Sequence, residues 1–201
     1  MRLPAASVIL AVLVSACART ALPRTDPIPV DAALSMQLAP AARTLDSAIA
    51  AGAAPGAVLA VSVGGRHFEH GIGQLAVDDP RPPDGRTIYD MASLTKVVAL
   101  TTLAMMAVQE NRIALDSPVV HYLSEFARGS GEKSRVVVRN LLLHDSGLPP
   151  DPIPPLWKHP GSRQSALAEA LGANLDTVPG ARMVYSDLGA ITLATIIERQ
   201  Y

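Results

Sequence analysis

The sequence predicts an α+β fold in which one antiparallel β-hairpin is combined with several helices. The segments AVLAVSV, residues 57–63, and RHFEHGIG, residues 66–73, flank Gly64-Gly65. Two adjacent glycines can supply the positive φ angles of a two-residue hairpin turn, so we expect two antiparallel strands here. A helix containing MASLTKVV, residues 91–98, is apolar nearly all round and should therefore be buried centrally.

The first seventeen residues predict an export segment that is not part of the fold. Arg2 precedes the apolar run SVILAVLVSA, which stops at Cys17, the only cysteine in the chain. The residues VSAC resemble the bacterial lipobox, in which the cysteine thiol receives a diacylglyceryl group, so residues 1–17 are expected to be a signal peptide with a lipobox. An ordinary cleaved signal is one alternative. A single membrane span is another, disfavoured because the run is shorter than the roughly 20 apolar residues needed.

The export segment should be followed by a tether and then by the folded domain. The stretch ARTALPRTDPIPV is proline-rich and unpatterned, as expected of a tether over residues 18–36. The domain is then expected to span residues 37–201. Helical spacing begins after Asp31, although Pro40 should kink this helix or mark its true beginning. Its apolar positions are Leu34, Leu38, Leu45 and Ile49, and Gly52 and Pro55 end it.

Shorter elements are expected in the second half of the chain. The segment IALDSPVVHYLSEF predicts a loop and a short helix, and VVVRNLLLHDSGLPP predicts a short helix stopped by Ser146-Gly147. Residues 149–159 should form a long irregular loop of the kind that often borders a binding site. A helix from Ser165 to Ala173, an extended piece RMVY and a last helix from Leu188 complete the chain.

Composition excludes several classes of partner and cofactor. The formal net charge is -1 and aromatic residues make up 3% of the chain, so nothing indicates a nucleic-acid partner. A lone cysteine permits no internal disulfide. His67 and His70 would lie on opposite faces of one strand, and no His-Glu-x-x-His spacing occurs, so no metal site is predicted. We expect no cofactor.

Ser93 and Lys96 are the first candidate catalytic residues. Side chains three positions apart share a helix face, so the Ser93 hydroxyl and the Lys96 amine can meet. A lysine desolvated by apolar neighbours loses preference for its charged form and can serve as a base for the serine. If Ser93 lies at the helix start, its backbone N–H is also unpaired and can help to hold an oxyanion.

The Ser-x-x-Lys spacing is weak evidence by itself. The chain has three lysines, and Lys133 in SGEK, residues 130–133, fits the same spacing. That second copy lies in a polar, glycine-bearing turn, where Lys133 is expected to stay hydrated and charged. For Lys96 and Ser93 the alternative is structural: the lysine extends from a helix end to solvent or forms an ion pair, and the serine caps the helix.

Tyr185 and Asp187 are the second pair of candidates. They lie in VYSDLGA, between an extended segment and a helix, where a tyrosine can face a cleft. Ser186-Asp187 can also act as the N-cap of the helix that follows, and the two roles are compatible. His144 is expected to be structural rather than catalytic.

Taken together, these motifs resemble the serine β-lactamase and penicillin-binding-protein family, especially its class C-like branch with esterases and D-alanyl carboxypeptidases. Tyr-Ser-Asp resembles the family's Tyr-x-Asn box. PGAVLAVSVGGRHFEHGIG resembles its opening hairpin, IYDMASLTKVV its nucleophile helix, and VRNLLLHDSGLP its Leu-Leu-x-His-x-Ser-Gly-Leu signature, in which the histidine is a structural corner. The resemblance runs from about Pro55 to the end. It implies a β-lactamase/transpeptidase-like fold, an antiparallel sheet packed by helices with a helical subdomain.

The resemblance also implies an acyl-serine mechanism. Ser93 would attack a carbonyl, Lys96 and Tyr185 would move the proton, and water would release the acyl group. Asp187 stands where class C enzymes usually carry asparagine. Because a carboxylate near Lys96 favours the ammonium, the role of main base should shift toward Tyr185, whose phenolate a nearby cation stabilises.

One family element is missing before Tyr201. The family's third box, Lys or His followed by Ser or Thr and then Gly, lies on a later strand that supplies the second oxyanion N–H. The chain is therefore expected to be the N-terminal part of a serine hydrolase, without the C-terminal sheet strands. The hairpin would then have an open edge and an uncovered apolar face.

The sequence-based hypothesis is an exported, lipid-anchored serine hydrolase of the bacterial cell envelope. Its substrate would be a β-lactam, a D-Ala-D-Ala peptide of peptidoglycan or an ester, and the lipid on Cys17 would be its contact with the membrane. The alternative is a noncatalytic envelope lipoprotein, or an inactive truncated fragment, that uses the same fold for binding.

Overall fold

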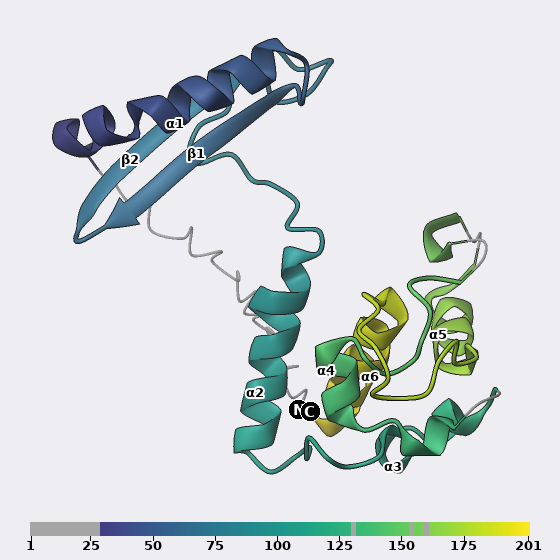
Figure 1. Ribbon diagram of the computed structural model, residues 1–201. Helices are drawn as coiled ribbons and strands as arrows, with labels where there is room; N and C mark the ends of the chain where they lie inside the picture. The colour runs from purple at the N-terminus through teal and green to yellow at the C-terminus, as the bar shows by residue number, and fades with distance from the viewer. Residues whose placement is uncertain (1–28, 130–131, 153–154, 159–160) are drawn as a thin grey trace, which may run out of the picture. The chain divides into compact units, whose positions relative to one another are not determined.

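The computed structural model describes residues 29–129, 132–152, 155–158 and 161–201. Predictions about the signal peptide, the lipobox and Cys17 lie outside these residues. The chain divides into two compact units at residues 88 and 89, and each unit has its own elements (Figure 1). Within the described part of the chain, no helix has both the length and the apolar character needed to cross a membrane.

The first unit consists of one helix on a two-stranded sheet. Helix α1 (Ala32–Ala50) begins at its N-cap Asp31, whose carboxylate accepts a hydrogen bond from the Leu34 N–H at 2.7 Å. The helix runs through Pro40 without ending. Residues 32–36 are therefore helical, and the tether predicted for residues 18–36 is wrong at its C-terminal end because Asp31 provides an earlier cap.

Strands β1 (Gly56–Val63) and β2 (Arg66–Gly73) form the predicted antiparallel hairpin. Gly64 and Gly65 have φ angles of 55° and 74°, which confirms the reason given for the two-residue turn. The unit's small core joins the hairpin to α1 and contains Leu34, Ala42 and Phe68, with Leu38, Leu59 and Val61 packed against it.

The prediction of an uncovered apolar face on this hairpin is wrong for the side that carries Phe68, because α1 covers it. On the other side the chain passes close to β2. A Cβ atom on Gly71 would lie 2.0 Å from the Pro83 carbonyl oxygen, and the Gly85 N–H donates to Glu69 at 2.5 Å. Among the described residues the sheet has two strands, so each keeps one edge outside the β1–β2 ladder.

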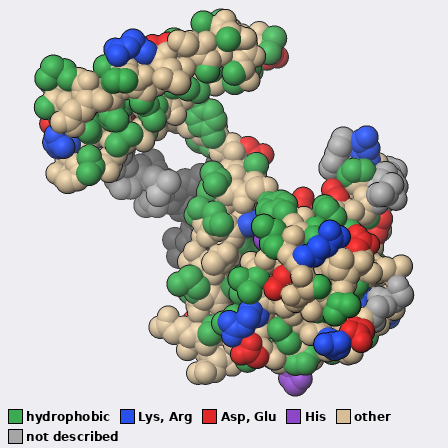
Figure 2. All heavy atoms as spheres, viewed as in Figure 1, with side chains coloured by type: hydrophobic (Ala, Val, Ile, Leu, Met, Phe, Trp, Pro, Cys, Tyr) green, Lys and Arg blue, Asp and Glu red, His purple; other side chains and the backbone are tan. Residues whose placement is uncertain are grey.

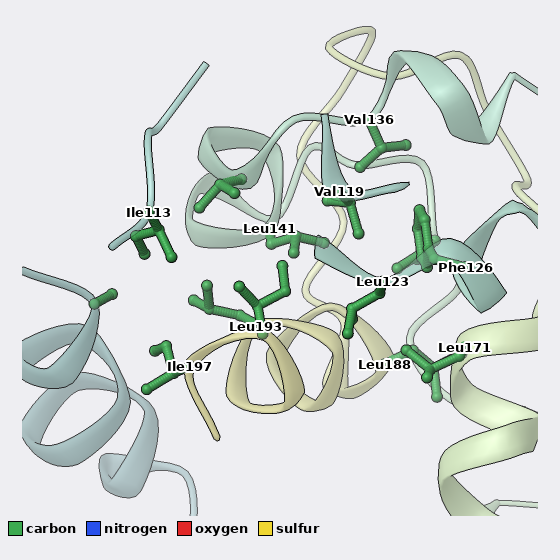
Figure 3. Close-up of a cluster of buried hydrophobic side chains, with 14 of the residues drawn as sticks. Ile113, Val119, Leu123, Phe126, Val136, Leu141, Leu171, Leu188, Leu193 and Ile197 are labelled. Atoms are coloured by element: carbon green, nitrogen blue, oxygen red, sulfur yellow. The ribbon is translucent and has the colours of Figure 1, made fainter. Parts of the chain in front are cut away.

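The second unit is helical and has one continuous core. Its elements are the π-helix η1 (Lys96–Leu100), α2 (Thr101–Gln109), α3 (Val119–Tyr122), η2 (Ser124–Ala127), η3 (Lys133–Arg135), α4 (Val138–Leu143), η4 (Leu156–Lys158), α5 (Arg163–Gly172) and α6 (Asp187–Gln200). Figure 3 shows side chains of other elements, among them Leu123 and Leu141, converging on Leu188 and Leu193 of α6, and all four are at most 2% exposed. The α+β class is confirmed.

The helix that follows Ser93 is not buried centrally, and that prediction is wrong. Only Ala104 and Ala107 of α2 are buried. Leu94, Val97 and Met105 are 60%, 60% and 67% exposed, and Figure 2 shows hydrophobic side chains on the surface of this helix. Within its unit the helix packs through one face only, so its apolar character exceeds what this unit buries.

Lys133 is buried, although its polar turn predicts hydration. Its side chain is 2% exposed, and Nζ donates to the carbonyl oxygens of Arg128, Leu171 and Ala173 at 2.9, 2.6 and 2.9 Å. Nζ also lies 4.2 Å from the centroid of the Phe126 ring. Leu171 and Ala173 are at the C-terminal end of α5, where helix carbonyls lack intrahelical partners. The ammonium thus caps α5, while burial lowers the pKa of Lys133 to about 8.

We expect Lys133→Ala to lower the free energy of unfolding by about 2–4 kcal/mol, because it leaves buried carbonyls without a donor and creates a cavity. Denaturant unfolding monitored by circular dichroism measures this loss. The control is Arg182→Ala, which removes an exposed cation of the same unit and should change stability much less. Equal stability of Lys133→Ala and wild type would contradict the capping role.

Candidate active site

Ser93 and Lys96 lie at the start of the helix that contains them, and their side chains meet, as predicted. Lys96 Nζ donates to Ser93 Oγ at 3.2 Å. The preceding residue, Ala92, has a φ of 42°, a conformation that a non-glycine residue rarely adopts, and its N–H is held by the Asp90 carboxylate at 2.8 Å. For the Ser93 N–H, no backbone acceptor occurs within the described residues. This N–H is therefore open to an incoming oxygen.

Asp187 joins this helix to α6. Its Oδ1 lies 2.8 Å from Lys96 Nζ, and this oxygen has no other polar partner among the described residues. Ser186 is the N-cap of α6, since its Oγ accepts from the Gly189 N–H at 3.1 Å. The capping interpretation thus holds for Ser186, while Asp187, the first residue of α6, faces the lysine. A carboxylate at this end is also favoured by the helix dipole.

Tyr185 completes the group. Lys96 Nζ lies 5.0 Å from the centroid of its ring, and the ring packs on that of His144 with the centroids 4.6 Å apart. The His144 Nδ1 accepts from the Ser186 N–H at 3.1 Å, and the His144 carbonyl accepts from the Val184 N–H at 2.7 Å. His144 therefore positions the segment that carries Tyr185.

The charges within the group favour an ammonium at Lys96, as expected from a carboxylate at Asp187, and not the deprotonated lysine that its apolar neighbours alone would favour. Partial burial disfavours the Lys96 charge, but hydrogen bonds to Asp187 and Tyr185 outweigh it and raise the pKa of Lys96. The same lysine, followed by Ser93, hydrogen-bonds to the phenol and lowers the pKa of Tyr185. Burial and the Lys96 charge lower the pKa of His144, which favours a neutral ring. Of the two candidate bases, Tyr185 is the one whose pKa moves toward neutrality.

A pocket of about 420 Å³ opens beside Lys96 and Asp187. Leu100, Leu156 and Ile191 contribute to a mostly apolar lining, together with alanines of α6. The sequence flagged the loop of residues 149–159 as a rim, and its Asp151 and Leu156 do line the pocket. The individual lining residues were missed, since nothing in their spacing distinguishes them from core positions.

The two histidines of strand β2 have side-chain partners within the first unit. His70 Nε2 lies 2.6 Å from Asp46 Oδ1 on α1, and His67 Nδ1 lies 2.9 Å from Ser62 Oγ. Within the described ranges, no set of three or more His, Cys, Asp or Glu side chains is arranged to hold a metal ion.

Comparison of the sequence with models of known protein families identifies the family of this chain. The family model described as Beta-lactamase matches residues 41–201, four-fifths of the chain. The chain belongs to the beta-lactamase family. The sequence-based resemblance and the β-lactamase/transpeptidase-like fold are thereby confirmed.

Individual members of the beta-lactamase family match in part. The human mitochondrial serine beta-lactamase-like protein LACTB is 36% identical over 98 residues, which are 47% of this chain and 18% of LACTB. A putative D-alanyl-D-alanine carboxypeptidase of Escherichia coli K12 is 27% identical over 135 residues, 63% of this chain and 31% of that protein.

The fold matches solved beta-lactamase structures as well. A class C beta-lactamase in complex with cefoxitin superposes with a TM-score of 0.68 at 24% identity, covering 83% of this chain and 45% of that one. The chain thus spans less than half the length of each of these three relatives.

We expect Lys96→Met to raise the pKa of Tyr185 toward the ordinary value of a phenol, because it removes the main hydrogen bond that stabilises the phenolate. Titration of ¹³C-labelled tyrosine by NMR measures the change. Ser93→Ala should produce a smaller rise, since Ser93 is the weaker of the two hydrogen-bonding partners. A Tyr185 pKa that is the same in wild type and Lys96→Met would show that the two groups do not interact in solution.

Proposed function

We propose that the protein is a serine hydrolase that works through an acyl-serine intermediate. The observation that carries the proposal is the convergence of Ser93, Lys96, Tyr185 and Asp187, with the Lys96 ammonium in contact with both the Ser93 hydroxyl and the Asp187 carboxylate. A serine hydroxyl becomes a good nucleophile only when a neighbouring base takes its proton. Membership of the beta-lactamase family supports the same class of reaction.

In the proposed mechanism, Tyr185 is the main base. Lys96 stays an ammonium because of Asp187, and as a cation it stabilises the phenolate of Tyr185. The phenolate removes the proton of Ser93 Oγ, which attacks the substrate carbonyl and forms an ester with the acyl group. The leaving group takes up a proton from Tyr185, and a water molecule activated by the same residue then hydrolyses the ester.

The proposed substrates are a β-lactam, a D-Ala-D-Ala peptide or an ester. Support comes from the relatives, which include a putative carboxypeptidase and a beta-lactamase bound to cefoxitin. The apolar pocket beside Lys96 suits the uncharged part of such a compound. The chain covers only part of each relative, and we propose that it shares the type of reaction of these longer proteins.

A fluorophosphonate probe or a labelled penicillin should modify Ser93 covalently, and Ser93→Ala should abolish the label. Tyr185→Phe should slow acylation by at least about 100-fold, because it removes the proposed general base but leaves the nucleophile. Mass spectrometry of the peptide containing Ser93 measures both effects.

Thr101→Ser, a conservative change further along the same helix, serves as the control and should label at the wild-type rate. Full acylation of Tyr185→Phe would rule out Tyr185 as the main base. A folded protein that takes up neither probe would favour the noncatalytic binding role instead.

We also propose export and lipid anchoring through Cys17, on the basis of the VSAC lipobox. In a bacterial host, metabolic labelling with an alkyne fatty acid should mark the wild-type protein in the membrane fraction, and Cys17→Ala should remove the mark. Labelling that persists in Cys17→Ala would exclude this anchor.

A further inference from the structure

The pocket beside Lys96 contains one more acidic group than the proposed mechanism uses. Its charged lining residues are Lys96, Asp187 and Asp151. Lys96 and Asp187 neutralise each other at 2.8 Å. Asp151 is left with no ion pair among the described residues, so the described lining of the pocket carries a net negative charge within a mostly apolar wall.

Asp151 is fixed in this position by the backbone next to it. The carbonyl oxygen of Pro150 accepts a hydrogen bond from the Asp187 N–H at 2.8 Å, which ties the loop to the start of α6. Ser186 Oγ donates to the Pro149 carbonyl at 2.6 Å and adds a second tie. Asp151 is therefore the residue that follows a doubly anchored segment of the loop.

The carboxylate of Asp151 makes one weak contact within the described residues. Its Oδ1 accepts from the Leu156 N–H at 3.4 Å, a long hydrogen bond, and the side chain is only partly buried. A partly desolvated carboxylate without a cationic partner is unfavourable in an apolar lining, and a cation supplied by a ligand would relieve this. The pocket thus combines an apolar wall with a carboxylate that the proposed mechanism does not use.

We propose that Asp151 selects substrates whose acyl part carries a primary ammonium group next to an apolar side chain. This inference rests on the proposed acyl-serine function and names its substrate class. Asp151 and Lys96 line the same pocket of about 420 Å³, and Lys96 contacts Ser93, so the acyl part of a substrate bound at Ser93 can extend into this pocket. Repulsion by Lys96 is small, because Asp187 compensates its charge.

Benzylpenicillin and ampicillin provide a matched pair of probes, because ampicillin differs only by an amino group on the acyl side chain. The second-order rate constant for acylation of Ser93 is measured for each by mass spectrometry. We expect ampicillin to react faster, and Asp151→Asn to lower the ampicillin-to-benzylpenicillin ratio by about threefold to fivefold, the size of a partly exposed ion pair. The benzylpenicillin rate itself should not fall.

Two further variants separate selection from general effects of charge. Asp151→Glu keeps the carboxylate and should keep the preference for ampicillin. Asp176→Asn removes one negative charge from an exposed position outside this pocket and should leave the ratio unchanged. Raising the salt concentration should shrink the wild-type preference, since the ammonium–carboxylate attraction is screened.

If a fluorophosphonate labels Ser93 but neither penicillin does, both penicillins are measured as reversible competitors of that labelling, and ampicillin must compete better. Equal reaction or equal competition by the two compounds, or a ratio unchanged in Asp151→Asn, overturns the role of Asp151 and leaves the hydrolase proposal intact. Absence of labelling by every probe overturns the hydrolase proposal, and the substrate preference with it.

Discussion

The ion pair between Lys96 and Asp187 is the contact on which the candidate site depends. It joins the start of the Ser93 helix to the first residue of α6, two segments about 90 residues apart in the sequence. The pair fixes the lysine between the serine hydroxyl and the tyrosine ring, and it also decides the lysine's charge. Because Lys96 is favoured as an ammonium, the proposed removal of the Ser93 proton is assigned to the phenolate of Tyr185.

The pair itself is supported by a frame of backbone hydrogen bonds. Ser186 caps α6 and bonds to the Pro149 carbonyl, and His144 accepts from the Ser186 N–H. These contacts hold the short segment that carries Tyr185 and Asp187 against the end of α4. The candidate reactive groups on loops and helix ends are thus positioned by residues to which the proposed mechanism gives no chemical role, a common way to keep a site rigid.

Local patterns predicted the parts of this molecule that local physics decides. The hairpin followed from Gly64-Gly65, because positive φ angles are a property of the residue, and the Ser93–Lys96 contact followed from helical spacing. The charge state of Lys96 did not follow from its apolar neighbours, because Asp187 reaches it from a distant segment. The burial predicted from sequence neighbours was wrong for the same reason in two places: one segment is buried that was expected to be exposed, and another is exposed that was expected to be buried.

Lys133 is the clearest case of that failure. Its neighbours in sequence are polar, yet distant carbonyls of α5 enclose it, whereas the apolar helix after Ser93 remains largely exposed in its unit. Hydrophobic pattern reports what a segment can bury, and the partners that bury it are set by the tertiary fold. The sequence did not predict Leu156 and Ile191 as pocket residues, because the tertiary fold decides whether an apolar side chain faces the core or a pocket.

His144 gives the site a sensitivity to acid that is independent of the serine chemistry. Its Nδ1 accepts a hydrogen bond from the Ser186 N–H, and its ring packs on that of Tyr185 at an interplanar angle of 35°. An imidazolium has no lone pair to accept with, so protonation would break that bond and set a second cation beside Lys96. Acidification would thus loosen the tyrosine's support. Burial and the Lys96 charge lower the pKa of His144, so this change is expected below the pH range in which a free imidazole titrates.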